Sequence, residues 1–486
     1  MRILFIVSRL AHVRHFDRAI RVLADRGHDV ILVSQDDDVE LHGVLTKQSR
    51  ITAVAGPRNR TDDWGAVATT LRRVRDFNRY LHPRYAHATL LRRRAFEKMI
   101  HAIGPAREIP PGWSELLRGV NKKEQRRLDA MLIKLEQAVP VDAGIHAFVA
   151  AQHPDVMVLS PMVGIGFSQA DFVKSARALG IPTAMLAFSW DNLSNKGLIH
   201  EMPDRLIVWN EIQAHEAFKL HKYPREQVVV TGAPRFDAFF EMQPQTTREE
   251  FCGMVGLDPG RPILTYLCSS KFVAAREQAF VPKWIQELRR SDDPLLASAS
   301  IIVRPHPAGM KGWHGEPRHV VRWPRVKAKA SVSRPFDDPQ AVVMNSPMQN
   351  ADQVLYDTVY HSAAVVGLNT SAEIEAAIVG RPVYTILDSA AEGQEGTLHF
   401  HYLLQAHGGH VNLADSFAQH RAQLSDALAG RYDHGPIAAF VQGFVRPRGL
   451  SVPASPLVAD AIEEAARLRL EPAAADRTSD QPAVSR

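Results

Sequence analysis

The sequence predicts an α/β protein whose domains are built from strand–helix–strand units, and three observations lead to this prediction. Residues 2–34 read as an apolar strand, a helix that ends at a glycine, and a second apolar strand. Residues 363–386 repeat this strand, helix and strand pattern far along the chain. A third apolar run at residues 300–303 ends in a stiff polar loop. A chain of 486 residues has room for two to four such domains.

The overall composition is that of a globular protein, with 45% hydrophobic and 23% charged residues. We find no apolar run of about 18 residues and therefore expect no transmembrane helix. Residues 1–7 are too short for a signal peptide and read as the first strand. The two cysteines, Cys252 and Cys268, lack a metal-binding spacing and favour a reducing compartment. We expect a cytoplasmic protein, either free or peripheral at the inner face of the membrane.

Positive charge is concentrated in two stretches of the chain, although the formal net charge is only +5. Residues 84–135 hold twelve Lys or Arg against five Asp or Glu, and residues 304–334 hold eight against one. The first stretch lies in a helical region, where it is either a solvated helix face or a contact for an anionic membrane surface. The second would suit a polyphosphate or an anionic polymer. Without a recognisable module carrying interleaved aromatics, nucleic acid is not an expected partner.

The turn between the strand ending near Gly367 and the following helix is a candidate phosphate site. Thr370-Ser371 stands where the helix would begin, and free N–H groups with the helix dipole favour an anion there. Glu375, one turn further on, could accept hydrogen bonds from a sugar hydroxyl. An ordinary βαβ unit, with Ser371 as N-cap and Glu375 solvated, explains the same residues.

A second candidate site follows the apolar run at residues 300–303. Arg304-Pro305-His306-Pro307 presents an Arg and a His from a loop stiffened by two prolines. In parallel sheets ligands bind at the carboxyl ends of the strands. Arg304 offers a bidentate fork to phosphate, and His306 can hydrogen-bond or protonate a phosphate oxygen. Alternatively, both are ordinary surface residues of a loop.

These two motifs together resemble the donor-nucleotide half of the GT-B glycosyltransferase superfamily. The closest resemblance is to CDP-glycerol glycerophosphotransferases and to capsule sialyl- and Kdo-transferases, which carry an Arg-x-His-Pro step and a paired Ser followed by an acid. Here the pair is Thr370-Ser371 and the acid is Glu375. The resemblance covers roughly residues 180 to 390. It implies two Rossmann-like domains facing a central cleft, with a nucleotide-activated donor held by the second domain.

The resemblance also implies a catalytic base in the first domain. In many GT-B enzymes a His at the position of His12 is the base, although Ala11 and His15 stand where Gly and Pro are common. Glycerophosphotransferases place a catalytic His where this chain has Asp191. Asp191 either deprotonates an acceptor hydroxyl or caps the next turn. Lys196 either binds phosphate or faces solvent.

Two further loops complete the predicted site. The turn from Gly232 to Arg235 resembles the end of the GT-B N-terminal domain, beside the cleft. Ser269-Ser270 follow a predicted strand directly, where hydroxyls and amides can hold a donor phosphate, although loop serines are common. Asp36-Asp37-Asp38 offers a metal site only superficially and reads as a solvated loop, so we expect no metal.

The expected organisation assigns each part of the chain a role. It comprises an N-terminal acceptor domain at 1–240 with a helical insertion at about 64–150, a linker at 241–261, a nucleotide-donor domain at 262–450, a crossover helix at 451–470 and a disordered tail at 471–486.

The sequence thus predicts a metal-independent transferase of surface-polysaccharide synthesis that needs no cofactor. It would move a sugar or polyol phosphate from a CMP-, CDP- or UDP-linked donor to a hydroxyl of a glycan or lipid-linked acceptor. A nucleotide-sugar 2-epimerase, a catalytically silent GT-B subunit and a basic nucleic-acid binder remain alternatives. The predicted catalytic residues are Asp191, His12 and His306; the donor-binding residues are Arg304, Ser269, Ser270, Asn369, Thr370, Ser371 and Glu375; the cleft residues are Lys196, Gly232 and Arg235.

Overall fold

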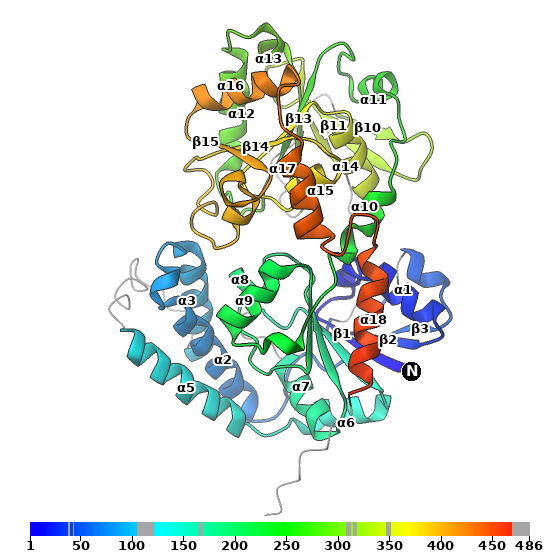
Figure 1. Cartoon of the computed structure of the whole chain (residues 1–486), viewed down its shortest axis with the longest axis vertical. Coiled ribbons are helices and arrows are strands. Elements are labelled where there is room, and N and C mark those ends of the chain that lie inside the picture. Colours follow the sequence, from blue (N-terminus) through cyan, green and yellow to red (C-terminus); the bar gives the residue numbers. More distant parts are fainter. Residues whose placement is uncertain are drawn as a thin grey trace, which may run out of the picture. The chain divides into compact units, whose positions relative to one another are not determined.

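The computed structural model consists of two compact units, described here one at a time (Figure 1). Unit 1 comprises Met1–Ala86, Leu91–Arg235 and the chain from Arg446 onward, and unit 2 comprises His87–Leu90 and Phe236–Val445. Three expected features lie wholly or partly outside the described residues: the Asp36 to Asp38 loop beyond Asp36, residues 105–120 of the helical insertion, and the tail at 471–486. The structure describes residues 1–36, 39–41, 43–104, 121–164, 169–307, 313, 318–346 and 351–468.

Unit 1 is organised around a seven-stranded sheet in which all neighbouring strands are parallel. Its strand order is β3-β2-β1-β4-β5-β6-β7. Most of its strands are continuous apolar runs, as expected for a parallel sheet covered on both faces. The strands are β1 (Arg2–Val7), β2 (Asp29–Ser34), β3 (Ile51–Ala55), β4 (Val156–Ser160), β5 (Thr183–Leu186), β6 (Arg205–Val208) and β7 (Val228–Val230).

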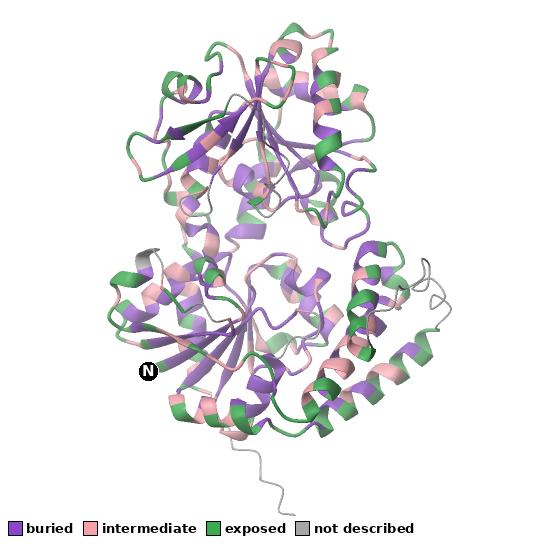
Figure 2. Cartoon of the chain, turned by 180° about the vertical axis from the view of Figure 1, so that it is seen from behind, coloured by how far each residue is buried: buried purple, intermediate pink, exposed green. Residues whose placement is uncertain are grey.

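The helices of unit 1 cover both faces of this sheet. Successive β1 side chains point to opposite faces, so Ile3 and Phe5 pack on one side while Leu4 and Ile6 pack on the other. Figure 2 shows these strands buried and the helices carrying mixed burial. The helices are α1 (Asp17–Asp25), α2 (Trp64–Tyr80), α3 (Thr89–Ile103), α5 (Lys122–Ala138), α6 (Ala143–Gln152), α7 (Gln169–Ala178), α8 (Asn192–Asn195), α9 (Glu211–His221) and α18 (Ala454–Ala466).

The C-terminal helix α18 belongs to unit 1, although the residues before Arg446 form unit 2. Its apolar face, including Val458 and Ile462, joins the core beside α1. Arg26 binds Asp460 at 2.7 Å, and His28 lies 2.9 Å from Glu463. Surface ion pairs of this kind add little stability. The C-terminal helix is therefore held on unit 1 mainly by the burial of its apolar face.

Unit 2 contains an eight-stranded sheet of order β10-β11-β12-β9-β8-β13-β14-β15. The pairs β10/β11 and β11/β12 are antiparallel, and the remaining pairs are parallel. The basic stretch at residues 318–334 forms β10, β11 and the turn between them. The strands are β8 (Ile263–Leu267), β9 (Ser300–Arg304), β10 (Arg318–Arg322), β11 (Lys329–Ser333), β12 (Ala341–Asn345), β13 (Ala364–Gly367), β14 (Val383–Ile386) and β15 (Val411–Ala414).

Residues 241–261, expected to form a linker, contain α11 and are part of unit 2. A capping box between Thr247 and Glu250 starts this helix, and Phe251, Cys252 and Val255 are buried in the core of unit 2. The helices of unit 2 are α10 (Asp237–Glu241), α11 (Arg248–Val255), α12 (Glu277–Arg289), α13 (Pro294–Ser298), α14 (Ala351–Tyr360), α15 (Ala372–Ile378), α16 (Phe417–Leu428) and α17 (Gly435–Phe440).

The predicted fold class is confirmed, since each unit is a parallel or mostly parallel sheet with helices on its faces. Within the described ranges, no helix is long and apolar enough to cross a membrane.

Candidate functional site

In unit 1, His12 lies in the 3₁₀ turn Leu10–His15 that follows β1. Its Nδ1 is 3.0 Å from the Ser8 hydroxyl, and its ring stacks on Phe188 with centroids 5.5 Å apart. Burial, together with Arg9 and Arg14, lowers the pKa of His12. The imidazole is therefore neutral at pH 7, the state that a general base requires.

His15, noted in the sequence only as a departure from the family pattern, belongs to the same group of residues. It is buried and lies against Phe188, with ring centroids 5.2 Å apart. Its pKa is well below the usual value because of burial and the charges of Arg235 and Arg14. The end of β1, the loop after β5 and the Arg235 turn thus meet around two neutral histidines.

Asp191 and Lys196, which were predicted separately, form an ion pair with 3.0 Å between Nζ and Oδ2. The Ser189 hydroxyl donates to the other carboxylate oxygen at 2.6 Å. Asp191 precedes α8 but makes no side-chain cap bond, so the capping alternative is wrong. Asn192 accepts instead from the N–H groups of Phe188 and Ser189. With both carboxylate oxygens engaged, Asp191 is less available as a base than His12.

The helical insertion holds the loop that carries this ion pair. Arg79, at the end of α2, is buried and donates to the carbonyls of Leu193 at 2.6 Å and Gly197 at 3.2 Å. The Tyr80 hydroxyl donates to the Lys196 carbonyl at 2.7 Å, and Asp76 accepts from the Leu198 N–H. These contacts join residues more than a hundred positions apart, so sequence periodicity gave no signal for them.

Gly232 and Arg235 lie in the turn after β7, and Arg235 is the last residue of unit 1 before the chain enters unit 2. Gly232 has φ 97°, and its N–H donates to the Trp209 carbonyl at 2.9 Å. This left-handed conformation explains the glycine. Arg235 lies close enough to His15 to lower its pKa.

In unit 2, Arg304 at the end of β9 is a partly buried cation with an unsatisfied nitrogen. Its Nη2 donates to the Ser346 hydroxyl at 2.8 Å, whereas Nη1 is buried without a hydrogen-bond partner. Among the described residues no carboxylate acts on its charge, and burial is the cause that shifts its pKa. Burial lowers its pKa to about 10, so it stays charged at pH 7. His306, two residues later, is half-buried, and burial lowers its pKa.

Ser346 was not predicted as a site residue, because the strand that precedes it, β12, was not recognised in the sequence. Its position follows from topology, since β12 and β9 are parallel neighbours whose carboxyl ends meet. Among the described basic residues of the 304–334 stretch, Arg318, Arg322 and Lys329 lie on β10 and β11, and Arg325 in the turn between these strands pairs with Glu250 at 3.1 Å. Of the described basic residues of this stretch, Arg304 lies at the carboxyl end of a strand that has parallel neighbours on both sides.

Ser269 and Ser270 follow β8, the next strand in the sheet, but the Ser269 backbone is already engaged. Its N–H donates to both oxygens of Glu277, at 2.8 and 3.1 Å, and the Tyr266 hydroxyl donates to the same carboxyl at 3.0 Å. Burial raises the pKa of Glu277 to about 8. The Ser269 hydroxyl is buried without a partner, so the side chain is the polar group left for a ligand.

In the loop after β13, two N–H groups that were expected to be free before α15 are already bound within the chain. The Asn369 N–H donates to Glu373 Oε1 at 3.1 Å, and the Thr370 N–H also binds this carboxyl. Ser371 makes no side-chain cap bond. Glu373 is fully buried, and burial raises its pKa to about 8. A buried acid of the chain thus binds two N–H groups of the loop just before the helix.

The remaining predicted residues of this loop are buried. Asn369 has φ 79°, a left-handed conformation that Asn tolerates, and its Nδ2 donates to the Gly393 carbonyl at 2.9 Å. Glu375 is 4% exposed, which excludes the solvated-helix alternative. Glu277 and Glu373 were missed because each acts on a backbone group of a loop, a role that carries no sequence motif.

The strand order brings the predicted donor residues to one edge of the unit 2 sheet. Four consecutive parallel strands of this sheet end beside a polar residue of the site. Ser346 follows β12, Arg304 and His306 lie at and after the end of β9, Ser269 follows β8, and Asn369 follows β13. Across the part of the chain that the structure describes, no group of three His, Cys, Asp or Glu residues is arranged to hold a metal ion.

Comparison with known proteins gives structural matches without sequence matches. No family model and no curated protein matches the chain. The UDP-GlcNAc 2-epimerase of Methanocaldococcus jannaschii matches with TM-score 0.48 and 12% identity over 94% of this chain and 98% of that one. A glycosyltransferase from Rickettsia africae gives TM-score 0.48 and 9% identity over 96% and 98%. The wall teichoic acid polymerase TagF gives TM-score 0.44 and 11% identity over 96% and 88%.

At such identities and TM-scores these structures carry no conclusion about the reaction. The fold class rests on the topology of the two sheets and on the return of α18 to unit 1.

Proposed function

We propose that the protein is a glycosyltransferase-type enzyme that uses a nucleotide-activated donor. The observation that carries the proposal is Arg304, a desolvated guanidinium at the carboxyl edge of a parallel sheet with one nitrogen unpartnered. A buried cation without a counter-ion is costly, and a bound anion offsets that cost through charge-assisted hydrogen bonds. The Arg304 guanidinium already donates one hydrogen bond to Ser346, and a phosphate oxygen of the donor would accept the hydrogen bond that remains unmade.

The proposed donor contacts combine predicted residues with one that the structure adds. Arg304 and Ser346 would bind the phosphate, His306 would hydrogen-bond the leaving oxygen, and the unpartnered Ser269 hydroxyl would donate from the adjacent strand. Asn369 and Glu375 remain candidates for the sugar or ribose hydroxyls. The Thr370 N–H would contribute less than the sequence predicts, because Glu373 already binds it together with the Asn369 N–H.

In unit 1 we assign acceptor activation to His12. The neutral imidazole takes the proton of an acceptor hydroxyl as that oxygen forms a bond to the donor's anomeric carbon or phosphorus. The bond from this centre to the nucleotide phosphate oxygen breaks, and the nucleotide leaves with the negative charge that Arg304 stabilises. The Asp191–Lys196 pair would orient the acceptor. The proposal needs no cofactor besides the donor.

Product analysis tests the proposal. The purified chain is incubated with CMP-, CDP- and UDP-linked donors, with and without lipid-linked or glycan acceptors, in buffer containing EDTA. The proposal predicts acceptor-dependent nucleotide release and an acceptor whose mass rises by the transferred group.

Free epimerised sugar formed without acceptor would instead identify a 2-epimerase, and nucleotide binding without turnover would identify a silent subunit. The Arg304→Met variant should lose nucleotide release. Arg290→Met, an exposed residue of the same unit, is the matched control.

A further inference from the structure

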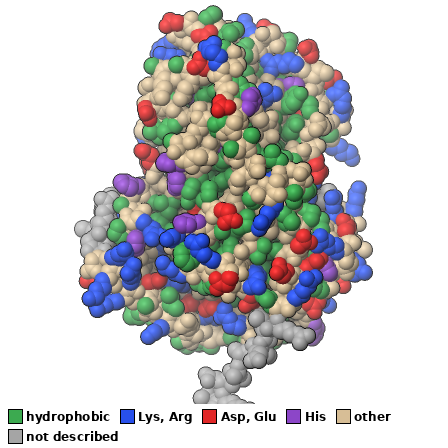
Figure 3. Space-filling view, viewed as in Figure 1, with side chains coloured by type: hydrophobic (Ala, Val, Ile, Leu, Met, Phe, Trp, Pro, Cys, Tyr) green, Lys and Arg blue, Asp and Glu red, His purple; other side chains and the backbone are tan. Residues whose placement is uncertain are grey.

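A second group of unpaired cations lines a pocket in unit 1 that belongs to neither site described above. The pocket has a volume of about 140 Å³ and lies between the start of α5, the turn containing Arg84 and the end of α9. A shallower hollow of about 440 Å³ adjoins it on α5. Figure 3 shows Lys and Arg side chains gathered over this part of unit 1.

The walls of the pocket are fixed by contacts between α2 and α5. The Asn78 amide donates to the Gln125 carbonyl and the Gln125 amide donates to the Asn78 carbonyl, both at 3.0 Å. Arg75 binds Asp129, the acidic residue among those lining the pocket, at 3.0 Å. The pocket therefore exists before any ligand arrives, and its acid is already neutralised.

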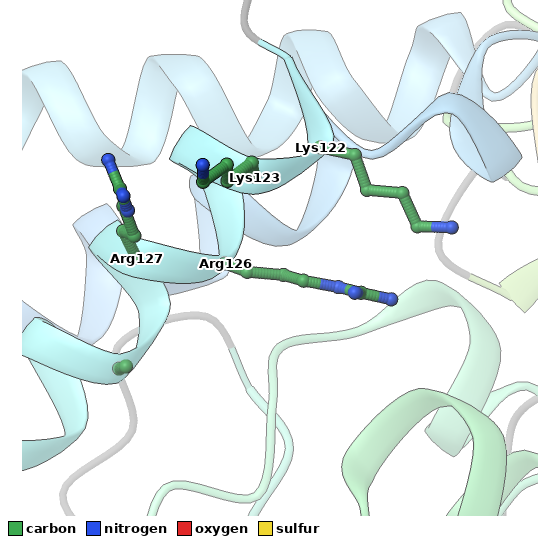
Figure 4. A pocket seen from close by; sticks show the side chains of 5 residues that line it. Lys122, Lys123, Arg126 and Arg127 are labelled. Atoms are coloured by element: carbon green, nitrogen blue, oxygen red, sulfur yellow. The ribbon is translucent and has the colours of Figure 1, made fainter.

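The cations around the opening have no such partners. Within the described ranges, Arg84, Lys122, Arg126, Lys219 and Lys222 line the pocket without an ion pair to a carboxylate. Lys122 and Arg126 are one helical turn apart, and Figure 4 shows both side chains extending in the same direction from α5. Arg84 donates to the Lys219 carbonyl at 3.2 Å, which satisfies one carbonyl at the end of α9.

The pKa of His82 is lowered by burial and by the positive charge of four of these residues. Burial is the largest cause of this shift, and the next causes are the charges of Arg84, Lys122, Arg126 and Lys222. The N-terminus of α5 adds partial positive charge, and the C-terminus of α9 opposes it with a smaller negative one. Positive charge from three separate elements converges on one opening.

We propose that this pocket binds a phosphate group, supplied either by a soluble phosphate or pyrophosphate compound or by the headgroup of a phospholipid. Lys and Arg side chains around a small concave site are the usual recognition chemistry for phosphate. The inference is independent of the donor site, since it rests on other residues of another unit.

Binding is measured on the full chain with two probes: inorganic pyrophosphate in solution, and vesicles of phosphatidylcholine with phosphatidic acid. The test variant is Arg126→Glu. Lys134→Glu, an exposed residue near the other end of the same helix, makes the same change in net charge. Arg126→Glu should weaken binding about tenfold or more, the effect of losing one charged hydrogen bond, and Lys134→Glu less than about twofold.

Binding of either probe with this pattern supports the site, and the probe that binds identifies the source of the phosphate. The His82 pKa, followed by NMR and assigned with His82→Gln, should rise when the ligand is bound, because the anion cancels the charges that lower it. Absence of binding to both probes, or equal losses in the two charge variants, would overturn the proposal.

Discussion

Replacing the buried acid Glu373 by Gln should change how the stability of the protein depends on pH. Glu373 Oε1 accepts the Asn369 N–H, and Oε2 is buried without a hydrogen-bond partner. A Gln side chain keeps the acceptor and has the shape of the protonated acid. The variant should therefore fold with about the wild-type stability at pH 5.

The magnitude follows from the pKa. Burial raises the folded-state pKa of Glu373 to about 8, against a usual value of 4.5. The folded state thus holds a proton that the unfolded chain releases, so the stabilising effect is complete below pH 4.5 and is lost as the pH rises through 8. The difference corresponds to on the order of 5 kcal/mol between pH 4.5 and 9. Glu277, whose pKa is also raised to about 8, adds to the same loss.

Urea unfolding from pH 5 to pH 9 measures this effect. The free energy of unfolding of wild type should fall steeply between these values, and that of Glu373→Gln should fall by several kcal/mol less. Removing Glu373 also removes a charge that raises the pKa of Glu277. Glu249→Gln, an exposed residue of α11, serves as control and should follow wild type. If Glu373→Gln and wild type keep parallel pH profiles, Glu373 is not held protonated and the reasoning fails.

Three further predictions concern Arg79, His420 and His12. Arg79→Met leaves carbonyls of the loop after α8 unsatisfied and should lower the free energy of unfolding, measured in urea, by about 3–5 kcal/mol. The control Arg127→Met, at an exposed residue, should lower it little. Equal effects of the two substitutions would contradict the role of Arg79 in holding the loop. His420 accepts the Trp284 indole N–H at 3.0 Å and has a pKa lowered to about 3 by burial, so stability should be lost as the pH falls from 6.5 toward 3. In His420→Gln the melting temperature should fall less over this pH range than in wild type. The same fall in both proteins would refute the assignment. His12→Gln should lower kcat about 10²- to 10⁴-fold, and the wild-type rate should rise as His12 loses its proton below pH 6.5 and then level off; a pH profile without this rise would exclude His12 as the base.

The predicted fold could be obtained from the sequence because strands of parallel sheets are apolar runs. The run 2–7 and the run 363–367 each became a central strand within one residue of the expected bounds. β15 and β10 were missed, since β15 has only four residues and β10 has just two apolar residues, Val320 and Val321, between polar and charged ones. α11 was missed because proline and glycine around it outweighed its capping box.

The candidate site was partly predictable for the same reason. Arg304 and His12 follow predicted strands, so the rule that ligands bind at the carboxyl edge located them. Glu373 and Arg79 act on backbone groups of loops, and no spacing reveals such contacts. Asp191 was recognised by position, but its ion pair with Lys196 required the structure.

Thermal stabilisation by nucleotides tests the central claim, donor binding at Arg304, most directly. Wild type, Arg304→Met and Arg290→Met are melted with CMP, CDP, UMP, UDP, GDP and ADP. A nucleotide at a hundred times its dissociation constant adds about 2.7 kcal/mol of stability, which is roughly 5–10 °C for a unit of this size. The account predicts this shift for one base in wild type and Arg290→Met, and its loss in Arg304→Met. An equal shift in Arg304→Met, or no shift with any nucleotide, would contradict it.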